Sequence, residues 1–213
     1  DPVRVAVLSD IHANLVALEA VLTAVGTIDA VWHLGDVVGY GSEPDAVVER
    51  LAGAGALGVA GNHDLAALGG PEIEWFNPDA RAAMEWTRRR IDERTRAWLA
   101  ALPTTREESG VTLVHGSPRD PVWEYVTTLA VARTNLEVME TALGLHGHTH
   151  QPIAWADRLH IVYLSFPDQA IMLWGGQKVP PDIGMFARNV GIFLALLLLI
   201  TATFVCAGAA LGD

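Results

Sequence analysis

The sequence predicts an α/β fold with a largely parallel sheet. Nearly continuous apolar runs, such as residues 3–8, have the composition of strands that are buried on both faces. The first three of these runs are separated by segments whose apolar residues recur at helical spacing. The resulting order of strand, helix, strand, helix and strand is typical of a right-handed α/β unit.

Composition narrows the classes of protein to consider. The chain has 213 residues, enough for one domain with a sizeable core or for a small domain plus an extra segment. Its net charge of -11 argues against a basic surface for nucleic acid. Cys206 is the only cysteine, which excludes a disulfide framework and a thiolate zinc cluster and fits a reducing compartment. The eight histidines offer ligands for borderline metal ions instead.

The first predicted strand, residues 3–8, ends in polar side chains. Because side chains two apart on extended backbone point the same way, we expect Asp10 and His12 to reach one ion together. Asn14 is a predicted helix N-cap. The apolar stripe that follows it is assigned to the core and consists of Leu15, Leu18, Leu22 and Val25.

The second predicted strand covers residues 30–34 and leads into Gly35 and Asp36. The glycine permits close backbone approach, and Asp36 follows the strand end, where ligands bind in such sheets. His33 lies inside the strand and is interpreted as a packed core histidine. A second helix is predicted over residues 42–51.

A third predicted strand, residues 56–60, delivers the sequence Gly61-Asn62-His63-Asp64. An Asn can give a metal ion its carbonyl oxygen, and a His can give a nitrogen or hold a proton. Taken alone, these four residues equally suit a turn with Asx hydrogen bonds. Two helices are predicted within residues 70–105, the first opened by Asn77. The run 88–90 of three arginines is interpreted as a solvated helix face, with a phosphate contact as the alternative.

Two more strand ends carry histidines. A predicted strand over residues 111–114 ends at His115, and an apolar segment at 143–145 leads into a histidine-rich sequence. There His148 and His150 share one face by the two-residue period. His146 is a weaker candidate because it precedes Gly147.

Five strand ends thus carry metal-ligand chemistry in a fixed order. They hold Asp10 and His12, then Asp36, then Asn62 and His63, then His115, and finally His148 and His150. This order, with the phrases Ser-Asp-Ile-His-Ala-Asn, Val-Gly-Tyr-Gly and His-Gly-Ser-Pro, resembles the calcineurin-like metallophosphoesterases over residues 3–160. It is most similar to the small bacterial and archaeal phosphodiesterases of that superfamily.

The resemblance implies a four-layer αββα sandwich and a centre of two divalent metal ions. Mn²⁺ is the first candidate, with Fe, Ni or Zn as alternatives, because mixed His/Asp/Asn sites accept several metals. His63 would face the substrate and either stabilise the charge on the phosphoryl group or protonate the leaving oxygen, and Asp64 would orient it through the other ring nitrogen. By the same resemblance, one ion would be held by Asp10, His12 and His150. The other ion would be held by Asn62, His115 and His148, and Asp36 would bridge the two.

The carboxyl-terminal part departs from the family. Residues 159–164 are a strand candidate, but the usual Asn-Pro-Gly-Ser turn and closing strands do not follow. We therefore expect an incomplete second sheet with a free edge near residues 161–164. The predicted divisions are a metallophosphoesterase domain over 1–167, a linker over 168–189 and a candidate transmembrane helix over 190–211.

Residues 190–211 contain no charge, and 22 helical residues are long enough to span a bilayer core of about 30 Å. Lys178 and Arg188 precede the segment, which predicts a cytoplasmic catalytic domain. The alternatives are a buried helix, or a foreign tail from a gene fusion or a mispredicted reading frame.

The predicted function is hydrolysis of phosphodiester or phosphomonoester bonds in a small phosphorylated substrate, by a water that two metal ions activate. The alternatives on the same fold are a non-catalytic metal-binding scaffold and a membrane-anchored binding module. His63 favours the enzyme, because a scaffold does not need an acid beside its ligands. The sequence leaves the oligomeric state and the choice of metal open.

Overall fold

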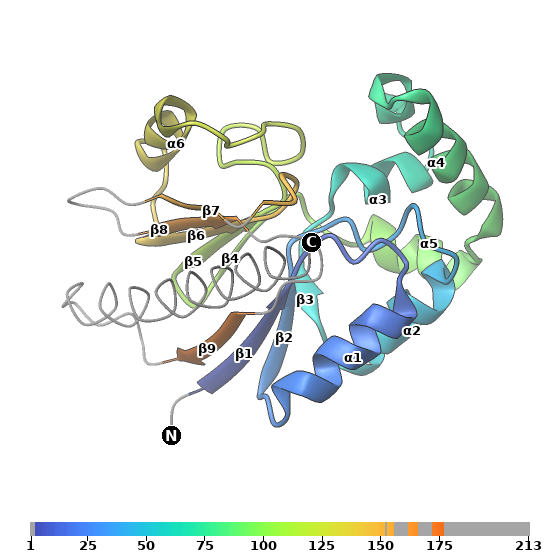
Figure 1. The fold of residues 1–213 in the computed structure, drawn as a ribbon, viewed down its shortest axis with the longest axis horizontal. Helices are drawn as coiled ribbons and strands as arrows, with labels where there is room; N and C mark the ends of the chain where they lie inside the picture. The colour runs from blue at the N-terminus through green and yellow to red at the C-terminus, as the bar shows by residue number, and fades with distance from the viewer. Residues whose placement is uncertain (1–2, 152, 156–161, 166–171, 177–213) are drawn as a thin grey trace, which may run out of the picture. The chain divides into compact units, whose positions relative to one another are not determined.

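A computed structural model describes residues 3–151, 153–155, 162–165 and 172–176 of the chain. These residues lie in one compact unit that ends at Gly176. They form two sheets flanked by helices (Figure 1). The candidate transmembrane helix at 190–211 lies outside the described residues, within which no helix is long and apolar enough to cross a membrane.

The first sheet has the strand order β3-β2-β1-β9. Its three parallel strands are β1 (Val3–Leu8), β2 (Ala30–His33) and β3 (Leu57–Gly58), and the antiparallel strand is β9 (Met172–Gly176). The register pairs Leu8 with His33, and His33 with Gly58. The three parallel strands therefore end at one level, and the polar residues that follow them emerge at one edge of the sheet.

The second sheet has the order β4-β5-β6-β8-β7. Its parallel centre consists of β5 (Val111–Val114), β6 (Leu143–His146) and β8 (Val162–Ser165), with β4 (Thr105–Glu108) and β7 (Ile153–Trp155) antiparallel at the two edges. Leu113 is paired with Leu145, so the segments with His115 and His148 leave the sheet side by side.

Two expectations for the carboxyl-terminal part are wrong. Strand β8 is not a free edge, because β6 and β7 pair with its two sides. Residues 168–189 are not a linker throughout, since β9 lies within them and pairs with β1 from Val3 to Val7. Backbone pairing to a distant strand leaves no local sequence signal, which explains why neither arrangement was predicted.

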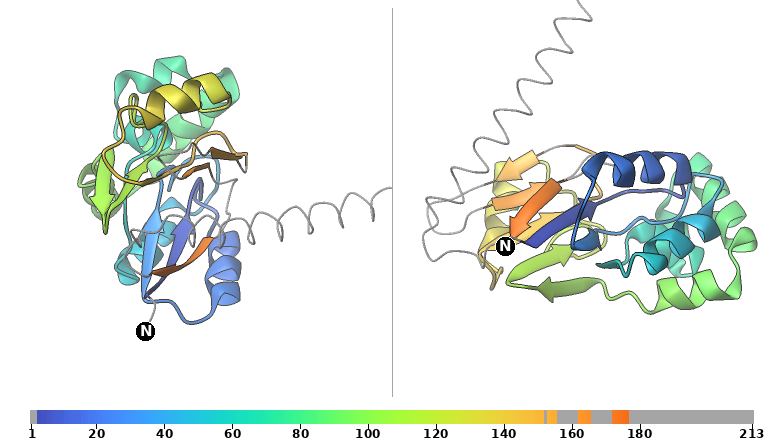
Figure 2. Two further views of the ribbon diagram at one scale, coloured as in Figure 1. Left: turned by 90° about the vertical axis from the view of Figure 1, so that its left-hand side faces the viewer. Right: turned by 90° about the horizontal axis from the view of Figure 1, so that it is seen from below.

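Helices cover the sheets on their outer sides (Figures 1 and 2). They are α1 (Leu15–Val25), α2 (Pro44–Gly53), α3 (Asn62–Ala67), the 3₁₀ helix η1 (Pro71–Trp75), α4 (Pro78–Arg90), α5 (Glu93–Ala100) and α6 (Leu129–Leu136). Helices α1 and α2 lie beside the first sheet, and α6 lies beside the second. The predicted N-caps are confirmed: Asn14 Oδ1 accepts from the Ala17 amide at 3.0 Å, and Asn77 Oδ1 accepts from the Ala80 amide at 2.9 Å.

Two apolar clusters join helices to sheets. The larger one brings Leu8 and Val31 from the first sheet against Leu18, Leu51 and Met84 from three helices, all buried. The smaller one packs Ala132 and Leu136 of α6 against Val114 of β5. His33 is fully buried in β2 with its ring 5.4 Å from that of Trp98, which confirms its interpretation as a packed histidine.

Candidate metal centre

The side chains predicted at the strand ends meet in one region, in which all except His150 are buried, but not for the reason expected. Asp10 and His12 do not follow extended backbone, since each has a φ of 51°. Left-handed φ values between 51° and 63° occur at five of the seven predicted metal ligands, namely Asp10, His12, Asp36, His148 and His150. Such conformations cost about 1–3 kcal/mol each and persist only where the surroundings enforce them.

Hydrogen bonds between the first two strand-end loops enforce this backbone. The Asp10 amide donates to the Gly35 carbonyl at 3.1 Å, and the His12 amide donates to the Asp36 carbonyl at 2.9 Å. The two loops therefore run together, and each fixes the side-chain direction of the other. Backbone of this kind is concentrated at functional sites, where residues must point in directions that a regular strand does not allow.

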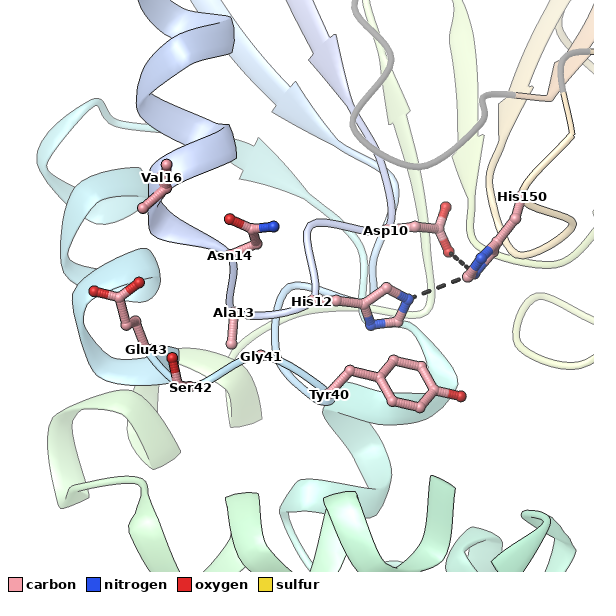
Figure 3. A pocket seen from close by; sticks show the side chains of 10 residues that line it. All are labelled: Asp10, His12, Ala13, Asn14, Val16, Tyr40, Gly41, Ser42, Glu43 and His150. Atoms are coloured by element: carbon pink, nitrogen blue, oxygen red, sulfur yellow. Dashed lines mark hydrogen bonds and ion pairs between the residues drawn. The ribbon is translucent and has the colours of Figure 1, made fainter. Parts of the chain in front are cut away.

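The first group of ligand atoms comes from Asp10, His12 and His150 (Figure 3). The His150 Nε2 atom lies 3.2 Å from Asp10 Oδ1 and 3.5 Å from His12 Nε2. The Ser9 hydroxyl donates to Asp10 Oδ2 at 2.5 Å, and the His148 amide also donates to that oxygen at 3.3 Å. These bonds occupy Oδ2 and leave Oδ1 directed at His150.

Asp36 lies between this group and a second one. Its Oδ2 atom is 3.9 Å from His12 Nε2 and 3.4 Å from His115 Nε2. Its Oδ1 atom accepts from the His63 amide at 2.9 Å. Burial would raise the pKa of Asp36, but the neighbouring histidines, His115 first, hold it well below the usual range. Asp36 is therefore a buried, ionised carboxylate, and its negative charge favours a cation beside it.

The second group surrounds His115 and fits a divalent cation. The His115 Nε2 atom lies 2.9 Å from Asn62 Oδ1, 3.1 Å from His148 Nδ1 and 3.4 Å from Asp36 Oδ2. One imidazole nitrogen carries at most one hydrogen and cannot donate to three partners, whereas a cation can bind all four atoms. The other ring nitrogen, Nδ1, donates to the Leu34 carbonyl at 2.8 Å, which turns Nε2 toward the group, as is usual for metal-bound histidines.

The charge balance of the second group points the same way. Burial would lower the pKa of His115, but the Asp36 carboxylate raises it to about 9. His148 shows the opposite result, since burial lowers its pKa to about 4. In this group, His115 therefore carries a proton beside the Asp36 carboxylate, whereas His148 is neutral. A bound metal ion would take the place of the proton on His115.

His63 stands at the border of both groups. Its Nε2 atom is 4.0 Å from Asp36 Oδ2, and its Nδ1 atom is 3.0 Å from the sulfur of Met84. Burial lowers its pKa to about 4, although Asp36 opposes the shift. Gly39 is needed here, because a Cβ at that position would lie 2.4 Å from His63 Nδ1 and its φ is +96°. The atoms of His12, Asp36 and His63 also lie close enough to hold an ion, so geometry permits His63 to bind metal as well as substrate.

Asp64 does not orient His63. Its carboxylate accepts from the Gly61 amide at 2.9 Å and from the Val38 amide at 3.0 Å, and it makes no hydrogen bond to the His63 ring. The reason is helix α3, which begins at Asn62 and was not predicted. Asp64 in its first turn bends back to accept from the amide of the N-cap residue Gly61, and it also accepts from Val38 in the loop after β2. Burial and the nearby Asp36 raise the pKa of Asp64 to about 7.

A pocket of about 740 Å³ opens onto the first group (Figure 3). It is bordered by Asp10, His12 and His150 on one side and by the start of α1 and residues 40–43 on the other. The ring of Tyr40 stands next to His12, with centroids 4.8 Å apart. The pocket provides space beside the ligand atoms for a small molecule.

Sequence reasoning missed the aromatic side chains around the centre. Tyr125 stacks on His148 with ring centroids 3.9 Å apart, and Phe76 meets the edge of His63 at 4.7 Å. Phe76 comes from the connection between η1 and α4, and Tyr125 from the loop between β5 and α6. Spacing in such segments carries no information about which strand end they will reach. His146, the weaker candidate, is buried within β6 and belongs to none of the three groups found among the described residues.

Comparisons with known proteins identify the family of the chain. A model of the calcineurin-like phosphoesterase superfamily domain matches residues 3–166. A metallophosphoesterase structure from Sphaerobacter thermophilus has a TM-score of 0.68 and 34% identity, covering 80% of this chain and 78% of that one. A hypothetical protein from Pyrococcus horikoshii, with a TM-score of 0.66, 17% identity and coverage of 89% and 94%, shares the fold.

An uncharacterized protein of Methanocaldococcus jannaschii is 39% identical over 129 residues. The matched part is 57% of this chain and 53% of that protein, so the chain spans about half the length of this curated relative. The family match covers most of the chain, including every predicted ligand and both sheets except β9. The chain therefore belongs to the calcineurin-like phosphoesterase superfamily.

Proposed function

We propose that the chain is a phosphoesterase whose active centre holds two divalent metal ions. The observation that carries the proposal is the position of Asp36, whose Oδ2 atom lies 3.9 Å from His12 Nε2 and 3.4 Å from His115 Nε2. A carboxylate between two ligand groups offsets the repulsion of two cations. Two ions bound at such a centre would activate a water and stabilise the oxygens of a phosphoryl group.

Each residue has a definite role in this proposal. His63, directed at Asp36 from the edge of the centre, would donate a proton to the leaving oxygen or stabilise charge on the phosphoryl group. Mn²⁺ is the first ion to test, because the donors are oxygens and imidazole nitrogens without a thiolate. The first ion would be held by Asp10, His12, His150 and Asp36, and the second by Asn62, His115, His148 and Asp36.

The substrate would be a small phosphorylated molecule. The pocket beside Asp10 and His150 supports this size class, since a volume of about 740 Å³ suits a small ligand. The net charge of -11 disfavours a polyanionic nucleic acid. Phosphomonoesters and phosphodiesters both remain substrates to test.

The test is metal analysis together with hydrolysis of phosphomonoesters and phosphodiesters by protein reconstituted with Mn²⁺, Fe²⁺, Ni²⁺ or Zn²⁺. We expect two ions per chain and turnover in the native protein, and loss of both in the Asp36→Ala variant. Two retained ions with normal turnover in that variant would refute the bridging role. Two bound ions without turnover of any ester in the native protein would favour the non-catalytic scaffold.

The predicted membrane anchor at residues 190–211 remains a proposal from sequence alone. Its support is the uncharged stretch of 22 residues. If the segment spans a membrane, the full chain resists extraction from membranes by carbonate. Deletion of residues 188–213 should then release the remaining chain from the membrane. A full-length chain that is monodisperse in buffer without detergent contradicts the anchor.

A further inference from the structure

Exposed aromatic side chains gather around the candidate metal centre. Among the described residues, the exposed aromatic residues are Tyr40, Trp75, Trp86 and Tyr125. All except Trp86 belong to one series of ring contacts that reaches the histidines of the centre. Trp75 is 68% exposed and Tyr125 55%, and exposed apolar side chains that gather in one patch mark interaction sites.

Two segments supply aromatic rings beside the centre, one at the end of η1 and one in the loop between β5 and α6. Trp123 lies 5.1 Å from Trp75, 5.5 Å from Phe76 and 6.2 Å from His148, measured between ring centroids. Tyr125 stacks on His148 at an interplanar angle of 29°. We call the set Trp75, Phe76, Trp123 and Tyr125 the aromatic surface. It is bordered by His63 through Phe76 and by His148 through Tyr125.

Hydrogen bonds fix both loops that carry these rings. Glu124, between Trp123 and Tyr125, accepts from the Ser117 hydroxyl at 2.7 Å and from the Asn135 side-chain amide at 2.6 Å. These bonds tie the loop to the segment after β5 and to helix α6. Rings that are held before a ligand arrives lose less conformational entropy on binding.

The loop with Trp75 and Phe76 is held in a similar way. Arg81 of α4 donates to the backbone carbonyl of Glu74 at 3.0 Å and to its carboxylate at 3.2 Å. Asn77 caps α4 directly after Phe76. Both halves of the aromatic surface are therefore built features of the fold.

We infer that the aromatic surface binds a planar aromatic ring in the ester group of the substrate, and so selects phosphoesters that carry such a ring. The inference rests on the proposed function, because a phosphoryl group at the metal centre brings its ester group next to His63 and His148. Aromatic faces stack on planar rings with little dependence on their substituents, so a nucleobase and a phenyl ring both meet the requirement.

The test compares esters that differ only in the ring. Adenosine 5′-phosphate and ribose 5-phosphate share the same primary ester oxygen, and each is used as the monoester and as its methyl diester. Phenethyl phosphate and ethyl phosphate form a second pair without a nucleoside. We expect kcat/KM to favour the ring-bearing member by about 5- to 150-fold, the range that one stacked base provides. A preference in both pairs indicates any aromatic ring, and a preference only for adenosine indicates a nucleobase.

Trp75 is the best position for a variant, because among the described residues its one ring contact is with Trp123 and not with a predicted ligand. Trp75→Ala should reduce the preference for the ring-bearing ester at least about 5-fold and leave ribose 5-phosphate turnover unchanged. Trp75→Phe should retain part of the preference. Trp86→Ala is the matched control, since Trp86 is exposed on α4 outside the ring series and should change neither rate.

Binding of adenosine provides a readout that does not require turnover. Adenosine carries no phosphate, so calorimetric titration of the metal-loaded protein with adenosine, and with ribose as control, reports the aromatic surface itself. We expect adenosine to bind the native chain and the Trp86→Ala variant, and to bind Trp75→Ala at least about 5-fold more weakly.

The outcomes separate the two proposals. Equal turnover within both ester pairs, with no adenosine binding, overturns the inference and leaves the phosphoesterase intact. A change of oligomeric state in Trp75→Ala with an unchanged ester preference also overturns it, because the surface is then a contact between copies. Absence of turnover for every ester contradicts the proposed function, and adenosine binding that depends on Trp75 would still support the ring site.

Discussion

His63 combines a buried setting with a fixed direction. Its ring lies between Phe76 and Tyr40, with centroids 4.7 Å and 4.6 Å away, and its Nδ1 atom contacts the Met84 sulfur. These contacts hold Nε2 on the side of Asp36, where a phosphoryl group would lie in the proposed mechanism. A histidine held in this way needs no carboxylate partner to keep its orientation.

Replacement of His63 should therefore affect the reaction more than the metal content. We expect His63→Ala to retain both ions and to lose about 10²- to 10⁴-fold in kcat, the usual contribution of general acid–base catalysis. The loss should be smaller for nitrophenyl esters, whose leaving group needs little protonation. Rates across a series of leaving groups provide the measurement. An equal loss for all of them would indicate that His63 stabilises charge instead, and loss of an ion would indicate that it is a ligand.

Asp64 acts on the backbone, so its replacement should primarily reduce stability. Asp64→Ala removes the acceptor of two buried amides, those of Gly61 and Val38, and each unsatisfied buried group costs about 1–3 kcal/mol. Asp64→Asn keeps one carbonyl oxygen and should lose less. Urea unfolding of both variants measures the effect. Native stability together with a large loss of rate would instead support the role in orienting His63.

The residues of the centre were predictable from the sequence, but their grouping by geometry was not. The chemistry of Asp, Asn and His at strand ends identifies candidate ligands whatever the backbone does. The two-residue period placed His148 and His150 on one face, whereas left-handed φ values of 63° and 55° send them to different groups. Only the family resemblance implied this separation, because a single sequence does not show which non-glycine residues adopt a left-handed backbone conformation.

Among the elements, strand β2 contains an unusual titratable group. His33 is fully buried, and neither ring nitrogen has a hydrogen-bond partner among the described residues. Burial, with a smaller contribution from the charge of Arg106, lowers its pKa from 6.5 to about 3. The folded state therefore keeps His33 neutral over a pH range in which the unfolded chain takes up a proton.

This shift predicts a loss of stability in mild acid. Below pH 6.5 the unfolded state binds one more proton at His33 than the folded state, so the free energy of unfolding falls as the pH drops toward about 3. Between pH 7.5 and 5.0 the loss from this residue is roughly 2 kcal/mol. His33→Phe, which keeps a ring beside Trp98, should lack this part of the pH dependence. Denaturant unfolding of both proteins at the two pH values measures it, and identical pH dependence would contradict the prediction.

The prediction of elements succeeded where sequence periodicity and capping residues mark them. Helices α1, α2 and α4 begin at or close to the predicted positions, since Asn and Pro residues mark their starts. Helix α3 was missed because Asn62–Ala67 is only six residues long and its first turn was interpreted as ligands. Strand β9 was missed because its pairing with β1 crosses most of the chain.

In the whole molecule, the two sheets each supply half of the centre. Asp10, Asp36 and Asn62 follow β1, β2 and β3 of the first sheet, whereas His115 and His148 follow β5 and β6 of the second. The carboxylate and imidazole ligand atoms nevertheless lie within 4.8 Å of one another inside each group, and Asn62 Oδ1 lies 2.9 Å from His115 Nε2. Bound ions would therefore connect the two sheets at the edge where the strands end.

Metal binding should consequently stabilise the whole unit and not only the loops. An ion that binds the folded chain alone adds RT ln(1 + [L]/Kd), or about 2.7 kcal/mol at a concentration of 100 Kd. We expect removal of metals by EDTA to lower the unfolding temperature, and added Mn²⁺ to restore it in a concentration-dependent way, as followed by calorimetry. The shift should nearly vanish in Asp36→Ala, which lacks the shared carboxylate, and persist in Trp86→Ala. The contrary result is an unfolding temperature that EDTA leaves unchanged in a chain that is proven to contain two ions. That result would mean that the sheets hold together without the ions, and that backbone hydrogen bonds alone enforce the left-handed loops.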